Sequence, residues 1–234
     1  MKTIFFLILS VSSLFNAFGQ NAREYYLKGN EKQLKGDHRG AIIDYNKAIE
    51  LNPNSADSYE SRGFSKKKLQ LYEESILDFS KAIEINPVWG SYHLRGESKD
   101  ALTDHRGAIA DYNKAIELNP NFEDSYIGRG FSKTKLNDNI GAILDYNMAI
   151  ELNPDSAPSY HLRAVGKSSL GDYKGAVLDC SKAIEIDPRN PQYYMNRGTN
   201  YLALKQKDNG CLDLSKAGEL GFKDAYNYIK KYCN

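Results

Sequence analysis

The sequence predicts an all-α fold, a solenoid of stacked helix-turn-helix repeats, and three observations carry this prediction. A ten-residue segment, first seen at Asp44–Pro53, returns along the 234-residue chain in steps of 33 or 34 residues. Apolar residues recur in it every three or four positions, which is the spacing of an amphipathic helix. Its five clear copies end in Asn-Pro or Asp-Pro, and a proline cannot continue a helix. Each copy therefore marks the last helix of one repeat.

A second signature precedes each copy and predicts the first helix of the repeat. A tyrosine is followed three positions later by Lys or Arg, and then by Gly or Ala. Another small residue opens the second helix, so the two helices can approach closely. Gly36-Asp37 and Gly171-Asp172 mark the turn between them. Six repeats are expected, at about 22–55, 56–88, 89–122, 123–156, 157–190 and 191–224.

These features resemble the tetratricopeptide repeat, a unit of about 34 residues with small residues at fixed places and a closing proline. The resemblance implies a right-handed α-solenoid. One departure is that the family often has Trp at the fourth position and Leu at the seventh, where this chain has Tyr and Arg or Lys. Residues 225–234 keep the period, because Tyr228 follows Tyr194 by 34 residues. They are expected to form a lone capping helix over the sixth repeat.

Residues 1–19 are predicted to be a signal peptide. Lys2 precedes an apolar run from Ile4 to Phe15, and Ala17-Phe18-Gly19 has small residues at the first and third places, as a cleavage site requires. The run is shorter than the roughly 20 residues that cross a bilayer, and serines interrupt it. We therefore expect an exported protein, periplasmic or secreted, with no integral membrane segment after cleavage. An uncleaved membrane anchor is the alternative.

Composition argues against several classes of function. The 31 Lys and Arg residues oppose 30 Asp and Glu residues, so no net basic field would attract nucleic acid. No two of the four histidines have the spacing that places two metal ligands on one helix face. Motifs for nucleophilic catalysis, zinc proteases and phosphate-binding loops are absent from the sequence. We expect no metal, no cofactor and no enzymatic activity, and a catalytic site assembled across repeats is the alternative.

Recurring charges predict an internal ladder of ion pairs. Each repeat has a basic residue on its first helix and an Asp on its second, and the two lie symmetrically about the turn, so antiparallel helices bring them level. Each Asp can also face the basic residue of the next repeat, and a basic stripe that binds anionic ligands is the functional alternative. The expected basic members are Lys28, Arg62, Arg95, Arg129, Arg163 and Arg197, and the acidic members are Asp44, Asp78, Asp111, Asp145, Asp179 and Asp213.

The resemblance also implies where a ligand binds. In the family, first-helix residues line a concave groove, and the fifth and ninth positions of the repeat contribute where peptides are bound. These positions are Tyr26 and Asn30, Glu60 and Phe64, His93 and Glu97, Ile127 and Phe131, His161 and Val165. They differ between repeats, as positions that read a ligand should. Phe64, His93 and Phe131 are expected to be more exposed than the other aromatic positions of the repeat and to face the same concave side. The function predicted is a non-enzymatic scaffold that binds a protein or peptide, and the alternative is a cell-envelope assembly or glycan-handling accessory protein.

Repeat geometry separates the three cysteines. Cys211 lies eleven residues before Phe222 and Cys233 lies eleven after it, so antiparallel helices bring the two level. An exported protein can form a disulfide between them, and two reduced core thiols are the alternative. Cys180 holds the position of Tyr45 and is expected to be a buried thiol.

Overall fold

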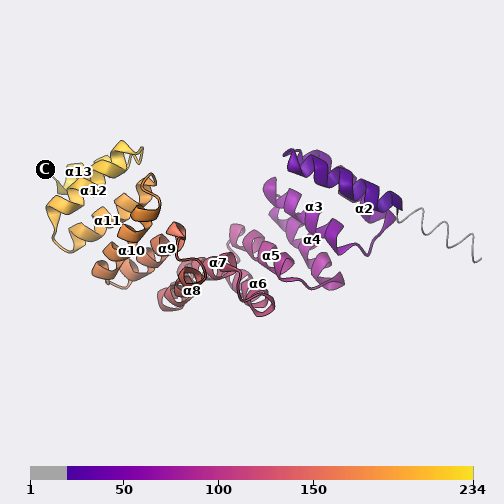
Figure 1. The fold of residues 1–234 in the computed structure, drawn as a ribbon, viewed down its shortest axis with the longest axis horizontal. Coiled ribbons are helices and arrows are strands. Elements are labelled where there is room, and N and C mark those ends of the chain that lie inside the picture. The colour runs from indigo at the N-terminus through magenta and orange to yellow at the C-terminus, as the bar shows by residue number, and fades with distance from the viewer. Residues whose placement is uncertain (1–19, 234) are drawn as a thin grey trace, which may run out of the picture. The chain divides into compact units, whose positions relative to one another are not determined.

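The computed structural model describes residues 20–233, and these consist of helices and turns without a strand (Figure 1). Neighbouring helices pack as helix-turn-helix pairs, which confirms the predicted all-α fold class. The chain divides into two compact halves, Met1–Asn119 and Pro120–Asn234, and the described residues of each form a stretch of α-solenoid. The predicted signal peptide lies outside the described residues.

The N-terminal half begins with residues 20–34 in helical conformation. They are followed by α2 (His38–Leu51), α3 (Ala56–Lys68), α4 (Tyr72–Ile85), α5 (Trp89–Ala101) and α6 (His105–Leu118). From α2 to α6, each helix packs against the next, and the first helices α3 and α5 also touch each other. Two of the three second helices begin at a capping aspartate: Asp37 accepts a hydrogen bond from the backbone N–H of Gly40 at 2.8 Å, and Asp104 makes the same contact with Gly107. The third, α4, follows Leu71 and has no side-chain cap.

The C-terminal half contains three further helix pairs and one final helix. Its helices are α7 (Glu123–Lys135), α8 (Asn139–Leu152), α9 (Ala157–Ser169), α10 (Tyr173–Ile186), α11 (Pro191–Ala203), α12 (Lys207–Glu219) and α13 (Ala225–Tyr232). Each of these also packs against the next in the stack. The final helix, α13, packs against α12 through an apolar cluster that includes Leu214, Ala217 and Ala225.

The core explains the small residue that follows each basic residue. Repeat positions are counted with Ala22 as position 1, so Gly96 is at position 8 of the third repeat. A Cβ added to Gly96 would lie 2.9 Å from Cε1 of Tyr112, which is fully buried on the partner helix. Tyr45, Phe79 and Tyr146 fill the same place in other repeats. Cys180 takes it in the fifth repeat and is a free, fully buried thiol, as predicted.

The turn inside each repeat holds one residue in the left-handed region of backbone space. Gly36 and Gly171 occupy this place in the first and fifth repeats, with φ of 79° and 81°. Glycine adopts this conformation without a steric penalty. The other four repeats place a residue with a side chain there: Gln70, Thr103, Asn137 and Lys205.

Candidate binding surface

The recurring charges of the repeat form buried ion pairs rather than an open surface. In five repeats the arginine binds the aspartate of its own repeat, and the carboxylates are buried. The pairs are Arg62–Asp78, Arg95–Asp111, Arg129–Asp145, Arg163–Asp179 and Arg197–Asp213. Where the arginine reaches further, it contacts the preceding repeat: Nη1 of Arg62 donates to Asn46 at 2.7 Å, and Nη1 of Arg163 to Asn147 at 2.8 Å. These guanidinium groups are occupied within the fold, so they do not form the basic stripe considered above.

In four of these five repeats, a lysine four positions after the arginine also binds the aspartate. Lys66, for example, places Nζ 2.8 Å from Oδ2 of Asp78. The sequence signal for this contact is a lysine one helical turn beyond the arginine. The other members are Lys99, Lys133 and Lys167.

The first repeat departs from the predicted ladder. Lys28 was expected to pair with Asp44, and this expectation is wrong: Lys28 binds Glu24 at 2.7 Å on its own helix, and Lys32 binds Asp44 at 2.6 Å. Glu24 lies one turn before Lys28 and captures its ammonium group. Lys32 lies at the second basic position and is the only basic residue that forms a salt bridge with Asp44 in the described part of the chain.

In the N-terminal half, the predicted groove positions are joined by contacts between α3 and α5. Lys67 forms an ion pair with Glu97, and the Ser91 hydroxyl donates to Glu60. Phe64 is half-buried, and Nζ of Lys67 lies 5.9 Å from the centre of its ring. The structure therefore brings Glu60, Phe64 and Glu97 together on a polar surface that is crossed by internal bonds.

His93 is not exposed, contrary to the expectation from its groove position. Its exposed fraction is 8%, because the imidazole packs 5.6 Å from the centre of the Tyr112 ring. Near the N-terminus, Asn30 accepts a hydrogen bond from the Tyr45 hydroxyl at 2.7 Å, and the Tyr26 ring lies 6.0 Å from the Tyr45 ring. These two groove positions therefore also support the core tyrosine.

In the C-terminal half, Phe131 is exposed at 38%, and Nζ of Lys135 lies 5.0 Å from its ring centre. Ile127 and Val165 are half-buried. His161 contacts α11, where Nδ2 of Asn196 lies 2.6 Å from its Nε2 and the Tyr193 ring lies 4.9 Å away. Burial lowers the pKa of His161, which favours the neutral ring that this contact requires.

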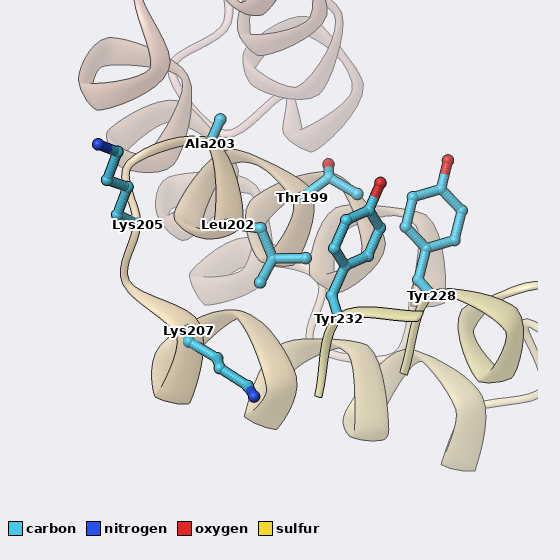
Figure 2. A pocket seen from close by; sticks show the side chains of 7 residues that line it. All are labelled: Thr199, Leu202, Ala203, Lys205, Lys207, Tyr228 and Tyr232. Carbon is cyan, nitrogen blue, oxygen red and sulfur yellow. The ribbon is translucent and has the colours of Figure 1, made fainter. Parts of the chain in front are cut away.

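A hollow in the C-terminal half lies between α11, the start of α12 and α13 (Figure 2). Its volume is about 390 Å³. Thr199, Leu202 and Ala203 come from α11, and the rings of Tyr228 and Tyr232 come from α13. Lys205 and Lys207 border it at the turn between α11 and α12. Thr199 holds position 9, so the hollow continues the predicted groove into the sixth repeat, where no residue was singled out from the sequence. We call these seven residues the C-terminal pocket.

A link between two cysteines holds α13 against α12 and so fixes one wall of the C-terminal pocket. In the structure Cys211 on α12 and Cys233 after α13 are joined, with their Cα atoms 5.8 Å apart. Tyr228 and Tyr232 both lie within the segment that this link closes.

Two negative findings apply to residues 20–233. They hold no cluster of three or more His, Cys, Asp or Glu side chains arranged to bind a metal ion. None of their helices is both long and apolar enough to span a bilayer.

Comparison with protein-family models identifies the family of the chain. Two models described as tetratricopeptide repeat match the chain, one at residues 22–55 and the other at 56–88, 90–122 and 157–190. The chain belongs to the tetratricopeptide repeat family. Among solved tetratricopeptide repeat structures, it is similar to MamA, with 24% identity over 75% of this chain and 96% of that one and a TM-score of 0.68. No curated protein matches the sequence.

Two further solved structures share the fold. YrrB, described as a TPR protein with an unusual peptide-binding site, is 21% identical, with 76% of this chain and 92% of that one covered and a TM-score of 0.65. The pilF protein of Pseudomonas aeruginosa is 13% identical, with 92% and 99% covered and a TM-score of 0.78. At these identities the likeness describes the fold alone.

Proposed function

We propose that this tetratricopeptide repeat protein is an exported, non-enzymatic scaffold that binds a segment of a partner protein on its first-helix surface. The observation that carries the proposal is the C-terminal pocket, which combines an apolar wall with exposed aromatic rings. A volume of about 390 Å³ suits one or two side chains of a docked segment. The peptide-binding site named for YrrB supports the same kind of role on this fold.

The chemistry of the pocket favours a segment that carries an apolar side chain next to an acidic one. Leu202 and the Tyr232 ring offer apolar contact, and tyrosine rings make efficient contact surfaces because they lose little conformational entropy. Lys205 and Lys207 are exposed and form no salt bridge within the described residues. An acidic side chain of the ligand would therefore gain ion-pair contacts at the rim of the pocket. A neutral glycan would leave both ammonium groups unpaired.

A peptide array tests this function. The array varies an apolar residue and its acidic neighbours, and a glycan array is probed in parallel with the mature protein. We expect binding to peptides of the apolar-acidic class, weakened at least about tenfold by Tyr232→Ala, as for an aromatic contact residue. Tyr226→Ala on the same helix is the matched control, because Tyr226 is exposed but does not line the pocket. Binding to glycans alone, or equal peptide binding by wild type and Tyr232→Ala, would refute the proposal.

Export is the second part of the proposal. It rests on the sequence of residues 1–19 and on the pair Cys211 and Cys233, whose Cα separation of 5.8 Å suits a disulfide. Disulfides persist in oxidising compartments such as the periplasm or the exterior of the cell. We therefore assign the protein to one of these compartments.

A further inference from the structure

The outward face of α8 is apolar over three successive turns. Ile140, Leu144 and Met148 are exposed at 68%, 61% and 39%, although all three side chains are apolar. They are spaced four residues apart, so they lie along one side of the helix. We call these three residues the α8 stripe.

Other second helices carry charges at two of these three positions. Where α8 has Met148, the other five repeats have a lysine that pairs with a glutamate three residues later. Where α8 has Ile140, they have Arg39, Glu73, Arg106, Lys174 and Asp208. The lysine pairs are Lys47–Glu50, Lys81–Glu84, Lys114–Glu117, Lys182–Glu185 and Lys216–Glu219. The α8 stripe is therefore a feature of this helix and not of the repeat.

We propose that the α8 stripe is the contact face of a homodimer, in which two copies of α8 pack antiparallel about a two-fold axis at Leu144. The stripe is symmetric about its centre, because Ile140 and Met148 lie four residues to either side of Leu144. Antiparallel pairing then places Leu144 on Leu144, and Ile140 on Met148 at both ends. A two-fold contact requires such a self-complementary surface.

Charge supports a second copy as the occupant. Because Met148 replaces the lysine, Glu151 at the C-terminal end of α8 makes no salt bridge within residues 20–233. Antiparallel packing brings Glu151 of one copy to the N-terminal end of the other α8. Asp138 already caps that end by accepting from the backbone N–H of Gly141, so the cation for Glu151 has to come from a neighbouring helix. Lys174, which holds the position of Ile140 one repeat later, is likewise without a salt bridge in the described part of the chain. It offers Glu151 of the second copy a cation at the same end.

The contact area sets the expected strength. Leu178 repeats the Leu144 position on α10 and is exposed at 71%, so it can extend the contact. Four exposed side chains per copy nevertheless form a small face beside the roughly 800 Å² per partner of a standard interface. The dimer should therefore be weak and reversible, with association visible only at about micromolar concentrations or above.

Sedimentation velocity over a wide concentration range tests the proposal on the mature protein. Ile140→Lys/Met148→Lys gives α8 residues that α10 already carries at these positions, so the variant should fold. We expect the wild type to form dimers and the double variant to associate at least about 100-fold more weakly. Leu77→Lys is the control, because Leu77 is an equally exposed leucine on α4 outside the stripe. A wild type that stays monomeric, or a dimer that the double variant leaves intact, would overturn the proposal.

Cysteine cross-linking tests the orientation. Under mild oxidation, Leu144→Cys should link to its own copy across the two-fold axis. Ile140→Cys should not, because antiparallel packing separates its two copies by roughly 12 Å, or eight residues of helical rise, beyond the reach of a disulfide. A mixture of Ile140→Cys and Met148→Cys should form the mixed dimer. Self-linking by all three variants would show a parallel pair and contradict the antiparallel arrangement.

Phospholipid vesicles test whether a membrane surface, and not a second copy, covers the α8 stripe. Wild type and the double variant are sedimented with zwitterionic vesicles, which do not attract the two added lysines, at a concentration where the wild type is monomeric. No difference in vesicle binding is expected. If the wild type binds through the α8 stripe while remaining monomeric at every concentration, the stripe serves a membrane surface and the dimer proposal is wrong.

Discussion

Arg163 holds Asp179 at two points and reaches a third helix at the same time. Its Nε lies 2.9 Å from Oδ2 and its Nη2 lies 2.6 Å from Oδ1 of Asp179, while Nη1 donates to Asn147 at 2.8 Å. One side chain therefore ties α9 to its partner α10 and to α8 of the preceding repeat. The planar guanidinium makes this possible, since an ammonium group cannot bind in a fork.

The two cations at Asp179 should differ in their contribution to stability. Arg163→Met removes the bidentate contact but leaves Nζ of Lys167 at 2.8 Å, so the free energy of unfolding should fall by about 2–3 kcal/mol. Lys167→Met should lower it by less than about 1.5 kcal/mol. The double variant leaves a buried carboxylate unpaired, and a loss of about 3–5 kcal/mol is expected. Urea unfolding measures all three, and equal effects of the two single variants would contradict this ranking.

Gly96 should not tolerate even a methyl group. A Cβ would lie 2.9 Å from Cε1 of Tyr112, so Gly96→Ala must displace a fully buried ring and should lower stability by about 1–3 kcal/mol. Gly90→Ala on the same helix is the matched control, because its Cβ would meet no atom within 4 Å. The control should be neutral or stabilising by up to about 1 kcal/mol. Thermal unfolding distinguishes the two, and similar melting temperatures would refute the packing argument.

Stability should decrease in mild acid because of His161. Burial lowers the pKa of His161 below its ordinary value of 6.5. Between that value and the lower folded pKa, the unfolded chain binds a proton that the folded protein does not, so stability is full above 6.5 and is lost as the pH falls. One group can contribute at most about 1.4 kcal/mol per pH unit. Urea midpoints at several pH values should fall less steeply for His161→Gln, and identical slopes for the two proteins would argue against this role.

The cysteines should differ in reactivity. A digest made without reductant should contain Cys211 linked to Cys233, and reduction should lower stability by roughly 3 kcal/mol for a loop of 22 residues. Burial raises the pKa of the Cys180 thiol to about 12, so iodoacetamide should modify it only after unfolding. Mass spectrometry reads both results. Alkylation of Cys211 and Cys233 without reductant would rule out the bridge.

The mature protein should begin near Gln20. The segment Ala17-Phe18-Gly19 has the residue sizes of a signal-peptidase site. N-terminal sequencing of protein from its own host measures the start directly, and Gly19→Pro should block processing as a control. An intact Met1 in the mature pool would refute the prediction.

The fold could be predicted because the repeat presents the same evidence several times. The Asn52-Pro53 stop, the small Gly96 and the aromatic Tyr112 each have counterparts at the same spacing, so a weak local signal becomes a strong global one. The buried arginine–aspartate ladder could be predicted for the same reason, because both charges recur at positions that antiparallel helices bring level.

Features confined to one repeat could not be predicted in this way. His93 is buried because its ring stacks near Tyr112, and no pattern in the sequence records which way an imidazole turns. Lys28 pairs with Glu24 and not with Asp44, because Glu24 lies one turn away on the same helix. The C-terminal pocket arises where two tyrosines of α13 meet α11. Tyr228 holds the repeated tyrosine position, but Tyr232 stands where all six repeats have Gly or Ala, so this wall of the pocket has no counterpart in the repeats.

The turn between the two helices of each repeat offers a place to stabilise the fold by substitution. Gly36 and Gly171 meet the left-handed backbone without penalty, whereas Thr103, a β-branched residue, adopts the same conformation at φ 63°. Four of the six turns carry this local strain, and three of them, at Gln70, Thr103 and Asn137, lie outside the C-terminal pocket and the ion pairs. The scaffold can therefore be made more robust one turn at a time, which makes it a suitable frame for presenting redesigned binding surfaces.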